Sequence, residues 1–231
     1  YFENNQSAPA TSVKGVKPQA SGAVGNPIVF QADPNFVGLV VIDQQHDQSR
    51  APGATVDPVE AVGFFIQGED HITIRGFEIR NVTTGILTDA IDQPFSSGVG
   101  AQGLFDPPSN IVIENNHIYN VRKDQRLPNF DGNIGPVVVN NCQDCAVRNN
   151  RLHDVSIING SGVEVFTNAN NAGVFSFGML RTVVENNEIY NAHTGIFVKA
   201  WSEQPEPTDA DYNPATLPPA INTATDFGVL A

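Results

Sequence analysis

Three residues close together in the chain, Tyr190, His193 and Lys199, have side chains suited to proton transfer. Lysine can accept a proton or neutralise a carboxylate, while tyrosine and histidine can protonate a leaving oxygen. A β-elimination, for example, needs a base for a carbon-bound proton, a cation for a neighbouring carboxylate and an acid for the leaving oxygen. The trio therefore predicts a candidate site for this chemistry.

Three carboxylates provide further candidates, as calcium ligands. Asp209 and Asp211 begin a stretch that opens like a calcium loop, but Pro214 stands where the turn glycine would be and Ala220 where the closing glutamate would be. This pattern excludes an EF-hand and leaves a simple calcium site as the expectation. Asp89 is the third candidate calcium ligand.

The elements that should position these residues form a sequence repeat. Four similar units start 39, 34 and 37 residues apart, a spacing typical of solenoids. Each has two short runs of alternating apolar and polar residues, which is the period of a β-strand. The four units are Ile72–Asn81, Ile111–Asn120, Cys145–Asp154 and Thr182–Asn191.

Aligned as columns, the units predict what each position does. Two columns are aliphatic and should face a shared core that no unit could bury alone. A turn column of Gly76, Asn115, Asn149 and Asn186 suits a left-handed backbone and an asparagine ladder. One outward column alternates in charge, which predicts ion pairing between neighbouring coils, about 4.8 Å apart. It consists of Arg75, Glu114, Arg148 and Glu185.

A third run follows each unit, which makes three strands per coil. These runs are Gly85–Leu87, Gly135–Val139, Gly162–Val165 and Gly195–Lys199. The repeat, together with the segment Ser21–Ala32, resembles the right-handed parallel β-helix of the pectate-lyase-like superfamily. The expected fold is all-β, with about six coils, a solenoid domain over residues 1–201 and an irregular segment over 202–231.

This resemblance implies a secreted or extracellular protein that acts on a polysaccharide, and an anionic one if calcium bridges acidic protein to acidic sugar. Lyases of this fold bind sugar along a groove, and lysine or arginine commonly serves as the base. The long connections 88–109, 122–134 and 167–180 border the third-run face, where Phe95, Phe105, Phe130 and Phe175 could stack on sugar or pin the loops. The family motifs of calcium-dependent pectate lyases, polygalacturonases and mannuronan epimerases are missing.

On that face, Glu164 joins Lys199, His193 and Tyr190 as a catalytic candidate. Glycoside hydrolysis would instead pair Asp89 with Glu164. These two carboxylates lie two coils apart, roughly 10 Å by strand spacing, which is marginal even for an inverting enzyme.

Charge and hydropathy exclude other partners. The chain has 25 acidic and 12 basic side chains and a net charge of −13. The sequence therefore shows no basic face of the kind that binds nucleic acid. No apolar run approaches the roughly 20 residues of a membrane span. The chain starts at Tyr1, within what resembles the middle of a structural segment. Either a signal and pro-region have been removed or the chain is a piece of a longer protein, and the second is favoured.

Cys142 and Cys145 leave three alternatives open: two thiols, a local disulfide, or metal or redox chemistry. A zinc site would need two more ligands, and His153 is the nearest candidate. For the whole chain, a uronic-acid polysaccharide lyase is favoured. The alternative is a non-catalytic extracellular β-helix, such as an adhesin, a structural protein or a carbohydrate-binding module.

Overall fold

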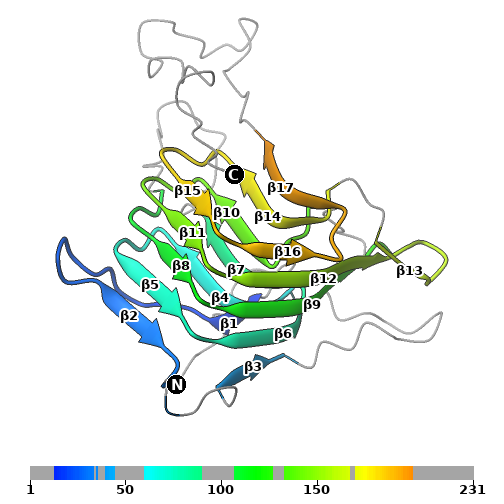
Figure 1. Cartoon of the computed structure of the whole chain (residues 1–231), viewed down its shortest axis with the longest axis horizontal. Helices are drawn as coiled ribbons and strands as arrows, with labels where there is room; N and C mark the ends of the chain where they lie inside the picture. The colour runs from blue at the N-terminus through cyan, green and yellow to red at the C-terminus, as the bar shows by residue number, and fades with distance from the viewer. Residues whose placement is uncertain are drawn as a thin grey trace, which may run out of the picture.

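A computed structural model describes residues 13–33, 35, 40–44, 60–89, 107–126, 133–166 and 170–199. In these ranges the chain forms strands β1 to β17 and no α-helix. The strands build three sheets whose neighbours run parallel and come from successive coils (Figure 1). This arrangement confirms the predicted parallel β-helix with three strands per coil and about six coils.

Each sheet takes one strand from each coil. The first sheet contains β1 (Val13–Val16), β4 (Glu60–Gln67), β7 (Thr84–Asp89), β10 (Val137–Asn140), β14 (Ala172–Phe177) and β17 (Thr194–Lys199). The second sheet contains β2 (Ile28–Gln31), β5 (Ile72–Arg75), β8 (Val112–Glu114), β11 (Ala146–Arg148) and β15 (Val183–Glu185). The third sheet contains β3 (Val41–Asp43), β6 (Glu78–Val82), β9 (His117–Asp124), β12 (Arg151–Ile158), β16 (Glu188–Tyr190) and the short antiparallel β13 (Glu164–Val165).

The core lies inside the three sheets and follows the predicted columns. Ile74, Ile113 and Val147 are in register on the second sheet, and Ile118 and Leu152 are in register on the third. All five are at most 1% exposed. Stacking the coils thus buries one continuous aliphatic column that a single coil would leave open.

The corners explain why asparagine recurs. At the corner between the second and third sheets, Gly76, Asn115, Asn149 and Asn186 have φ of 78°, 55°, 55° and 53°. This is the left-handed region, which glycine and asparagine tolerate best. Left-handed residues recur at two further places: Asn81, Asn120, Asp154 and Asn191 in or just after the third-sheet strands, and His71, Asn110, Asp144 and Arg181 at the corner between the first and second sheets.

The asparagine ladder lies one residue later than predicted. Asn115 and Asn149 are exposed, whereas Asn116 and Asn150 are buried and bonded to each other. The Nδ2 of Asn150 also donates to Oδ1 of Asn187, 3.0 Å away. The first asparagine of each pair supplies the left-handed turn, and the second turns its amide toward the neighbouring coils, where it replaces lost backbone hydrogen bonds.

The third run of the Cys145–Asp154 unit was assigned wrongly. Residues 162–165 do not enter the first sheet, because Glu164 and Val165 pair antiparallel with the end of β12. The chain reverses through a tight turn in which the backbone N–H of Gly162 donates to the carbonyl of Asn159. The first-sheet strand is β14, which lies inside the expected loop 167–180. Alternation is the same in both segments, so it could not distinguish them.

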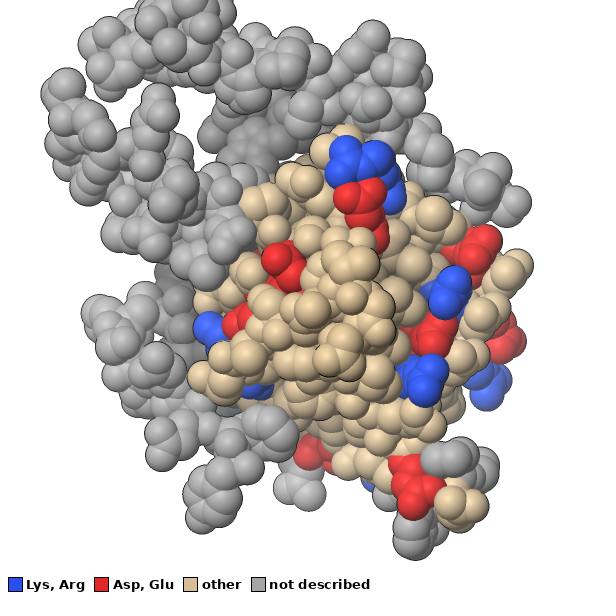
Figure 2. Space-filling view, turned by 90° about the vertical axis from the view of Figure 1, so that its left-hand side faces the viewer, with Lys and Arg blue, Asp and Glu red and all other residues tan. Residues whose placement is uncertain are grey.

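The predicted charge pairing is present on the second sheet. Arg75 Nη1 lies 3.5 Å from Glu114 Oε1, and Arg148 Nη2 lies 2.9 Å from Glu114 Oε2. Glu185 is in register with Arg148. Figure 2 shows blue and red side chains alternating along one side of the molecule. These ion pairs link three successive coils, so that charge pairing accounts for Arg75, Glu114 and Arg148.

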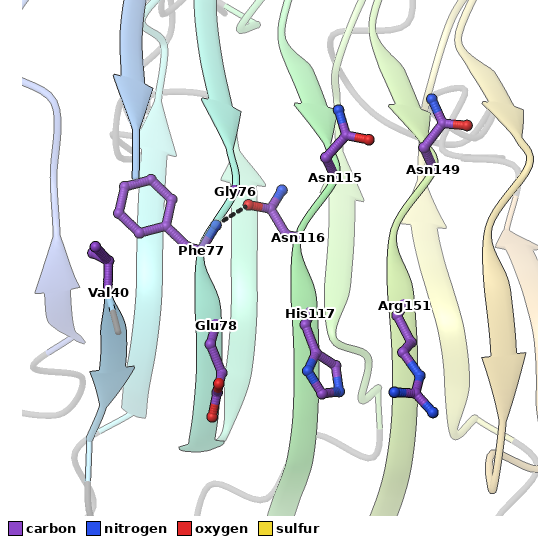
Figure 3. A pocket seen from close by; sticks show the side chains of 9 residues that line it. All are labelled: Val40, Gly76, Phe77, Glu78, Asn115, Asn116, His117, Asn149 and Arg151. Carbon is purple, nitrogen blue, oxygen red and sulfur yellow. Dashed lines mark hydrogen bonds between the residues drawn. The ribbon is translucent and has the colours of Figure 1, made fainter. Parts of the chain in front are cut away.

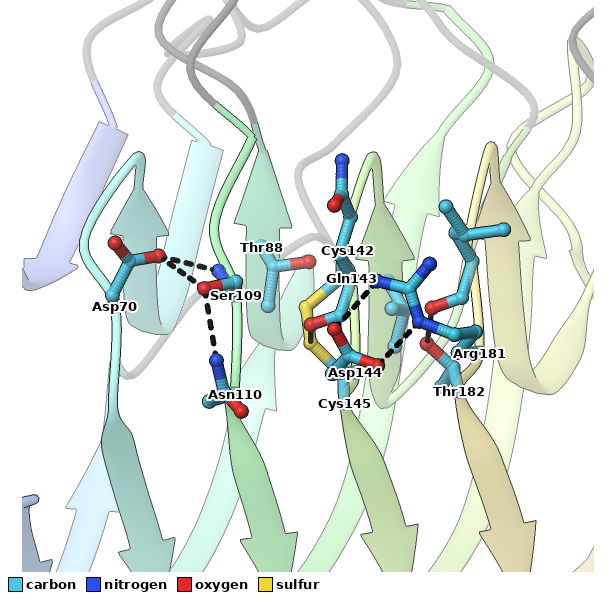
Figure 4. The surroundings of a disulfide bond; sticks show 12 residues. Asp70, Thr88, Ser109, Asn110, Cys142, Gln143, Asp144, Cys145, Arg181 and Thr182 are labelled. Atoms are coloured by element: carbon cyan, nitrogen blue, oxygen red, sulfur yellow. Dashed lines mark hydrogen bonds and ion pairs between the residues drawn. A yellow bond between two sulfur atoms is a disulfide. The ribbon is translucent and has the colours of Figure 1, made fainter. Parts of the chain in front are cut away.

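Cys142 and Cys145 form a disulfide at the corner between the first and second sheets (Figure 4). This selects the second of the three alternatives over two thiols or a metal site. Next to it, Arg181 is paired with Asp144, with Nε 2.6 Å from Oδ1. No described helix is long and apolar enough to cross a bilayer.

Candidate functional site

The structure does not bring the predicted trio together. Tyr190 lies on β16 in the third sheet, and His193 is exposed in the bend before β17. Lys199 ends β17 on the first sheet, six residues beyond His193, which is roughly 20 Å along an extended strand. One chemical step could not use both His193 and Lys199.

The predicted carboxylates are also separated. Glu164 projects from the third sheet, where its Oε1 accepts a hydrogen bond from Ser156 and pairs with Arg122 Nη2 at 2.8 Å. Asp89 ends β7 on the first sheet and accepts a hydrogen bond from Asn141. Asp89 and Glu164 therefore belong to different faces, which removes the hydrolytic pair. Asp209 and Asp211 lie outside the described residues.

One outward row of the first sheet, the expected sugar-binding face, is apolar. Leu87, Val138, Phe175 and Phe197 stand in register along it, with Val138 6% and Phe175 0% exposed. Phe175 is thus a packed strand residue rather than a loop residue. Phe95, Phe105 and Phe130 lie outside the described residues. Nothing described on this row offers groups for proton transfer.

Polar chemistry gathers instead on the outside of the third sheet. Alternate residues of its strands face outward, so two outward columns cross β6, β9, β12 and β16 side by side. We call these residues, with the adjacent Asp154, the third-sheet cluster. Its members are Glu78, Arg80, His117, Tyr119, Arg151, His153, Asp154, Glu188 and Tyr190.

One part of the third-sheet cluster is a phenol held between opposite charges. Tyr119 donates its hydroxyl proton to Glu78 Oε1 at 2.7 Å and accepts from Arg80 Nη1 at 3.2 Å. Arg80 is fixed in turn by Asp43, whose Oδ2 lies 2.9 Å from its Nε. The hydrogen bonds to Tyr119 and Asp43 raise the pKa of Arg80, so its charge is permanent. Burial is the main cause that raises the pKa of Tyr119, which keeps the phenol protonated.

The other part is a pair of imidazoles. The Nε2 atoms of His117 and His153 are 2.8 Å apart, and Nδ1 of His153 is 2.8 Å from Oδ2 of Asp154. Burial lowers the pKa of His117, and His153 and Arg151 lower it further. Burial raises the pKa of Asp154, but hydrogen bonds from Asn191 and His153 outweigh this and leave it below its ordinary value. At neutral pH the site thus combines a neutral histidine with an ionised aspartate.

The aromatic rings of the third-sheet cluster cover each other's faces. Ring centroids of Tyr119 and His153 are 5.2 Å apart, and those of His153 and Tyr190 are 4.4 Å apart, with nearly parallel planes. Arg151 lies over the ring of Tyr190 at 5.4 Å. Because the faces are occupied, the outward edges with their nitrogen and hydroxyl groups remain to meet a ligand.

A pocket of about 370 Å³ opens beside these groups (Figure 3). Glu78, His117 and Arg151 come from three adjacent strands and line one side of it. The corner asparagines Asn115 and Asn149 line the other. A volume of this order is at the small end of ligand pockets, and carboxyl, imidazole, guanidinium and amide groups give it a polar wall.

Of the predicted site residues, only Tyr190 belongs to the third-sheet cluster. His117 was missed and His153 was considered only as a zinc ligand, although the aligned units hold their signal. The outward columns read Glu78, His117, Arg151, Glu188 and Arg80, Tyr119, His153, Tyr190. Unlike the ladder on the second sheet, these columns mix imidazole and phenol with charges, which strand pairing alone does not require.

No family model and no curated protein matches this chain. Among solved structures, the chain is similar to an alginate lyase from Paenibacillus sp. str. FPU-7. The identity is 14%, and the match covers 85% of this chain and 93% of that one with a TM-score of 0.23. At this TM-score the likeness carries no argument, and the function has to be inferred from the residues of the third-sheet cluster.

Proposed function

We propose that the chain is a lyase that binds an anionic, uronic-acid-containing polysaccharide across the third sheet and cleaves it by β-elimination. One observation supports this most. A phenol bonded to a guanidinium lies beside a neutral imidazole that lines a pocket open to solvent. Base, acid and cation are thus within one cluster, as the reaction requires.

Each group has a definite role in the proposed step. His117 takes the C5 proton, and the electron pair of that C–H bond forms the C4–C5 double bond. The C4–O bond breaks, and Tyr119 protonates the departing oxygen. Arg151 neutralises the uronate carboxylate, because its ion pair with Glu188 is exposed and 3.3 Å long and can exchange for substrate. Arg80 holds the phenol in place.

The remaining expectations belong to this proposal. A disulfide is typical of proteins in oxidising compartments and supports secretion. Within the described residues no three His, Cys, Asp or Glu side chains form a metal site. A role for Ca²⁺ through Asp89, Asp209 and Asp211, and a role for Lys199, stay predictions that the same assay tests.

One observation favours a second candidate, a non-catalytic binding or structural β-helix. Glu78, Arg80 and Tyr119 are bonded to one another, so that packing between coils accounts for their contacts. Such a module would bind sugar through polar edges, because its ring faces are covered.

The deciding experiment mixes the protein with alginate, pectate and glycosaminoglycans, each with Ca²⁺ or with a chelator. The unsaturated uronate product is followed by its ultraviolet absorbance. We expect a rise on one polymer that Tyr119→Phe and His117→Gln each reduce at least about 100-fold, the usual scale of general acid–base catalysis. Arg148→Gln on the second sheet is the matched control and should keep full activity.

The outcomes separate the candidates. Binding of a polymer without the absorbance rise would favour the non-catalytic module. A rise that survives both substitutions but disappears in Lys199→Ala would move the site to the first sheet. No binding and no rise with any polymer would refute the lyase and the carbohydrate-binding module, and would leave a structural β-helix.

A further inference from the structure

His117, His153 and Asp154 form a continuous hydrogen-bonded chain with two links of 2.8 Å each. We propose that the three residues are a proton relay in which His153 and Asp154 are positioning residues for His117. A proton taken up by His117 then leaves its positive charge on His153. The inference rests on the proposed function for its purpose, but the relay itself is a separate property of the fold.

Hydrogen-bond donors and acceptors define the starting state in which both imidazoles are neutral. The ionised carboxylate of Asp154 can only accept, so Nδ1 of His153 must donate to it. In neutral His153, Nε2 is then the acceptor, and Nε2 of His117 must be the donor across the 2.8 Å contact. Nδ1 of His117 is then unprotonated and its lone pair can accept a proton. His117 lines the pocket, and the only hydrogen bond that its imidazole makes to the described residues is the one to His153.

Protonation then proceeds in two coupled movements. A proton from a ligand binds to Nδ1 of His117, and the proton on Nε2 of His117 moves to Nε2 of His153. His117 returns to a neutral form with its proton on the other nitrogen, and His153 becomes an imidazolium between His117 and the carboxylate. No proton is lost and no other reactant is needed.

The neighbours of the two imidazoles differ in charge: a carboxylate contacts His153, and a guanidinium faces His117. His117 faces Arg151, and burial also disfavours its charged form. His153 touches a carboxylate that is fixed by a hydrogen bond from Asn191 to its second oxygen at 2.8 Å. The other titratable or charged groups that face the pair are Glu78 and Arg80 on β6, Tyr119 on β9, and Glu188 and Tyr190 on β16.

Asp154→Asn is the sharpest test, because the amide cannot stabilise an imidazolium as a carboxylate does. Asparagine also tolerates the φ of 56° at this position, so the backbone need not move. The matched control is Asp144→Asn, since Asp144 occupies another left-handed position of the same coil with φ of 53° and pairs with Arg181. Both variants remove one carboxylate from the same type of site.

The readout is the nitrogen-15 NMR titration of the imidazoles, with signals assigned by His117→Gln and His153→Gln. We expect the pair to take up one proton in a single coupled step while the proton of His117 changes nitrogen. Asp154→Asn should lower the midpoint of that step by about 1–3 pH units, the usual effect of a neighbouring carboxylate. Asp144→Asn should leave it unchanged.

Two independent titrations of His117 and His153, or a midpoint that Asp154→Asn does not move, would overturn the relay. The titration needs no substrate, so an inactive protein with a coupled pair would refute the proposed function and support the relay. If the protein is an active lyase, the acid side of its kcat/KM–pH profile should shift with the NMR midpoint. Activity with an unshifted profile in Asp154→Asn would refute the relay alone.

Discussion

Replacing the buried Asn150 with alanine should be among the most destabilising single substitutions in this chain. The side chain is 2% exposed and makes four hydrogen bonds. It accepts from the backbone N–H and the Nδ2 of Asn116, and it donates to the carbonyl of Ile113 and to Oδ1 of Asn187. Alanine removes all four and fills none of the space.

The expected loss follows from this count. At about 1 kcal/mol net for each hydrogen bond, Asn150→Ala should lower the free energy of unfolding by about 4 kcal/mol. Domains of this kind are stable by only about 5–15 kcal/mol, so the change is a large share of the total. The neighbour Asn149 provides the control: it is exposed, has φ of 55°, and its side chain bonds to none of the described residues.

The assay is urea unfolding followed by far-ultraviolet circular dichroism, with the disulfide kept oxidised. Asn149→Gly should change the free energy of unfolding by less than about 1 kcal/mol, because glycine suits the left-handed turn. A loss below about 1 kcal/mol in Asn150→Ala, or equal losses in both variants, would show that the amide ladder does not stabilise the coils as argued.

Three further predictions concern packing, the disulfide and pH. Gly85→Ala would place a Cβ 2.4 Å from Ile118 Cγ2, so we expect the free energy of unfolding measured in urea to fall by about 1–3 kcal/mol or more. Gly160 is the control: a Cβ there would have nothing within 4 Å, so Gly160→Ala should not change the free energy of unfolding. Replacing both cysteines of the disulfide with serine should cost about 2 kcal/mol by chain entropy, and added reductant should then have no further effect on the melting temperature. In the folded protein, the pKa of His117 lies below its ordinary value of 6.5. As pH falls through 6.5, the unfolded chain therefore binds more protons at this residue than the folded protein does, and the free energy of unfolding should decrease. His117→Gln should flatten that dependence in melting curves recorded from pH 8 to pH 5, and an unchanged slope would contradict the assignment.

The sequence predicts the coil well because the alternation of apolar and polar residues in short strands indicates which side chains face inward. Ile113 and Glu114 are neighbours on β8, yet one is buried in the core and the other joins the charge ladder, as their columns indicate. The asparagine ladder was displaced by one position, because two adjacent asparagines look alike until the turn gives one of them a left-handed backbone. The Glu164 segment was misplaced because a hairpin and a coil strand alternate in the same way.

The candidate site was harder to predict than the fold. Tyr190 was found, but it was grouped with His193 and Lys199 by closeness in the chain. In a solenoid, residues that meet on a face lie one coil apart, so Tyr190 contacts His153, 37 positions away, rather than its sequence neighbours. The pairing of His117 with His153 depends on a register that only the assembled third sheet supplies.

The corner between the second and third sheets also limits how this chain can change in length. In four successive coils it consists of two residues, at 76–77, 115–116, 149–150 and 186–187, while the connections at the other corners range from residue 83 alone to residues 90–111. An insertion or deletion at the two-residue corner would break the amide ladder and turn every outward group of the following strand inward. Evolutionary gain and loss of residues should therefore concentrate at the other two corners. The wall of the pocket that this corner forms would then persist among homologues whose loops differ widely.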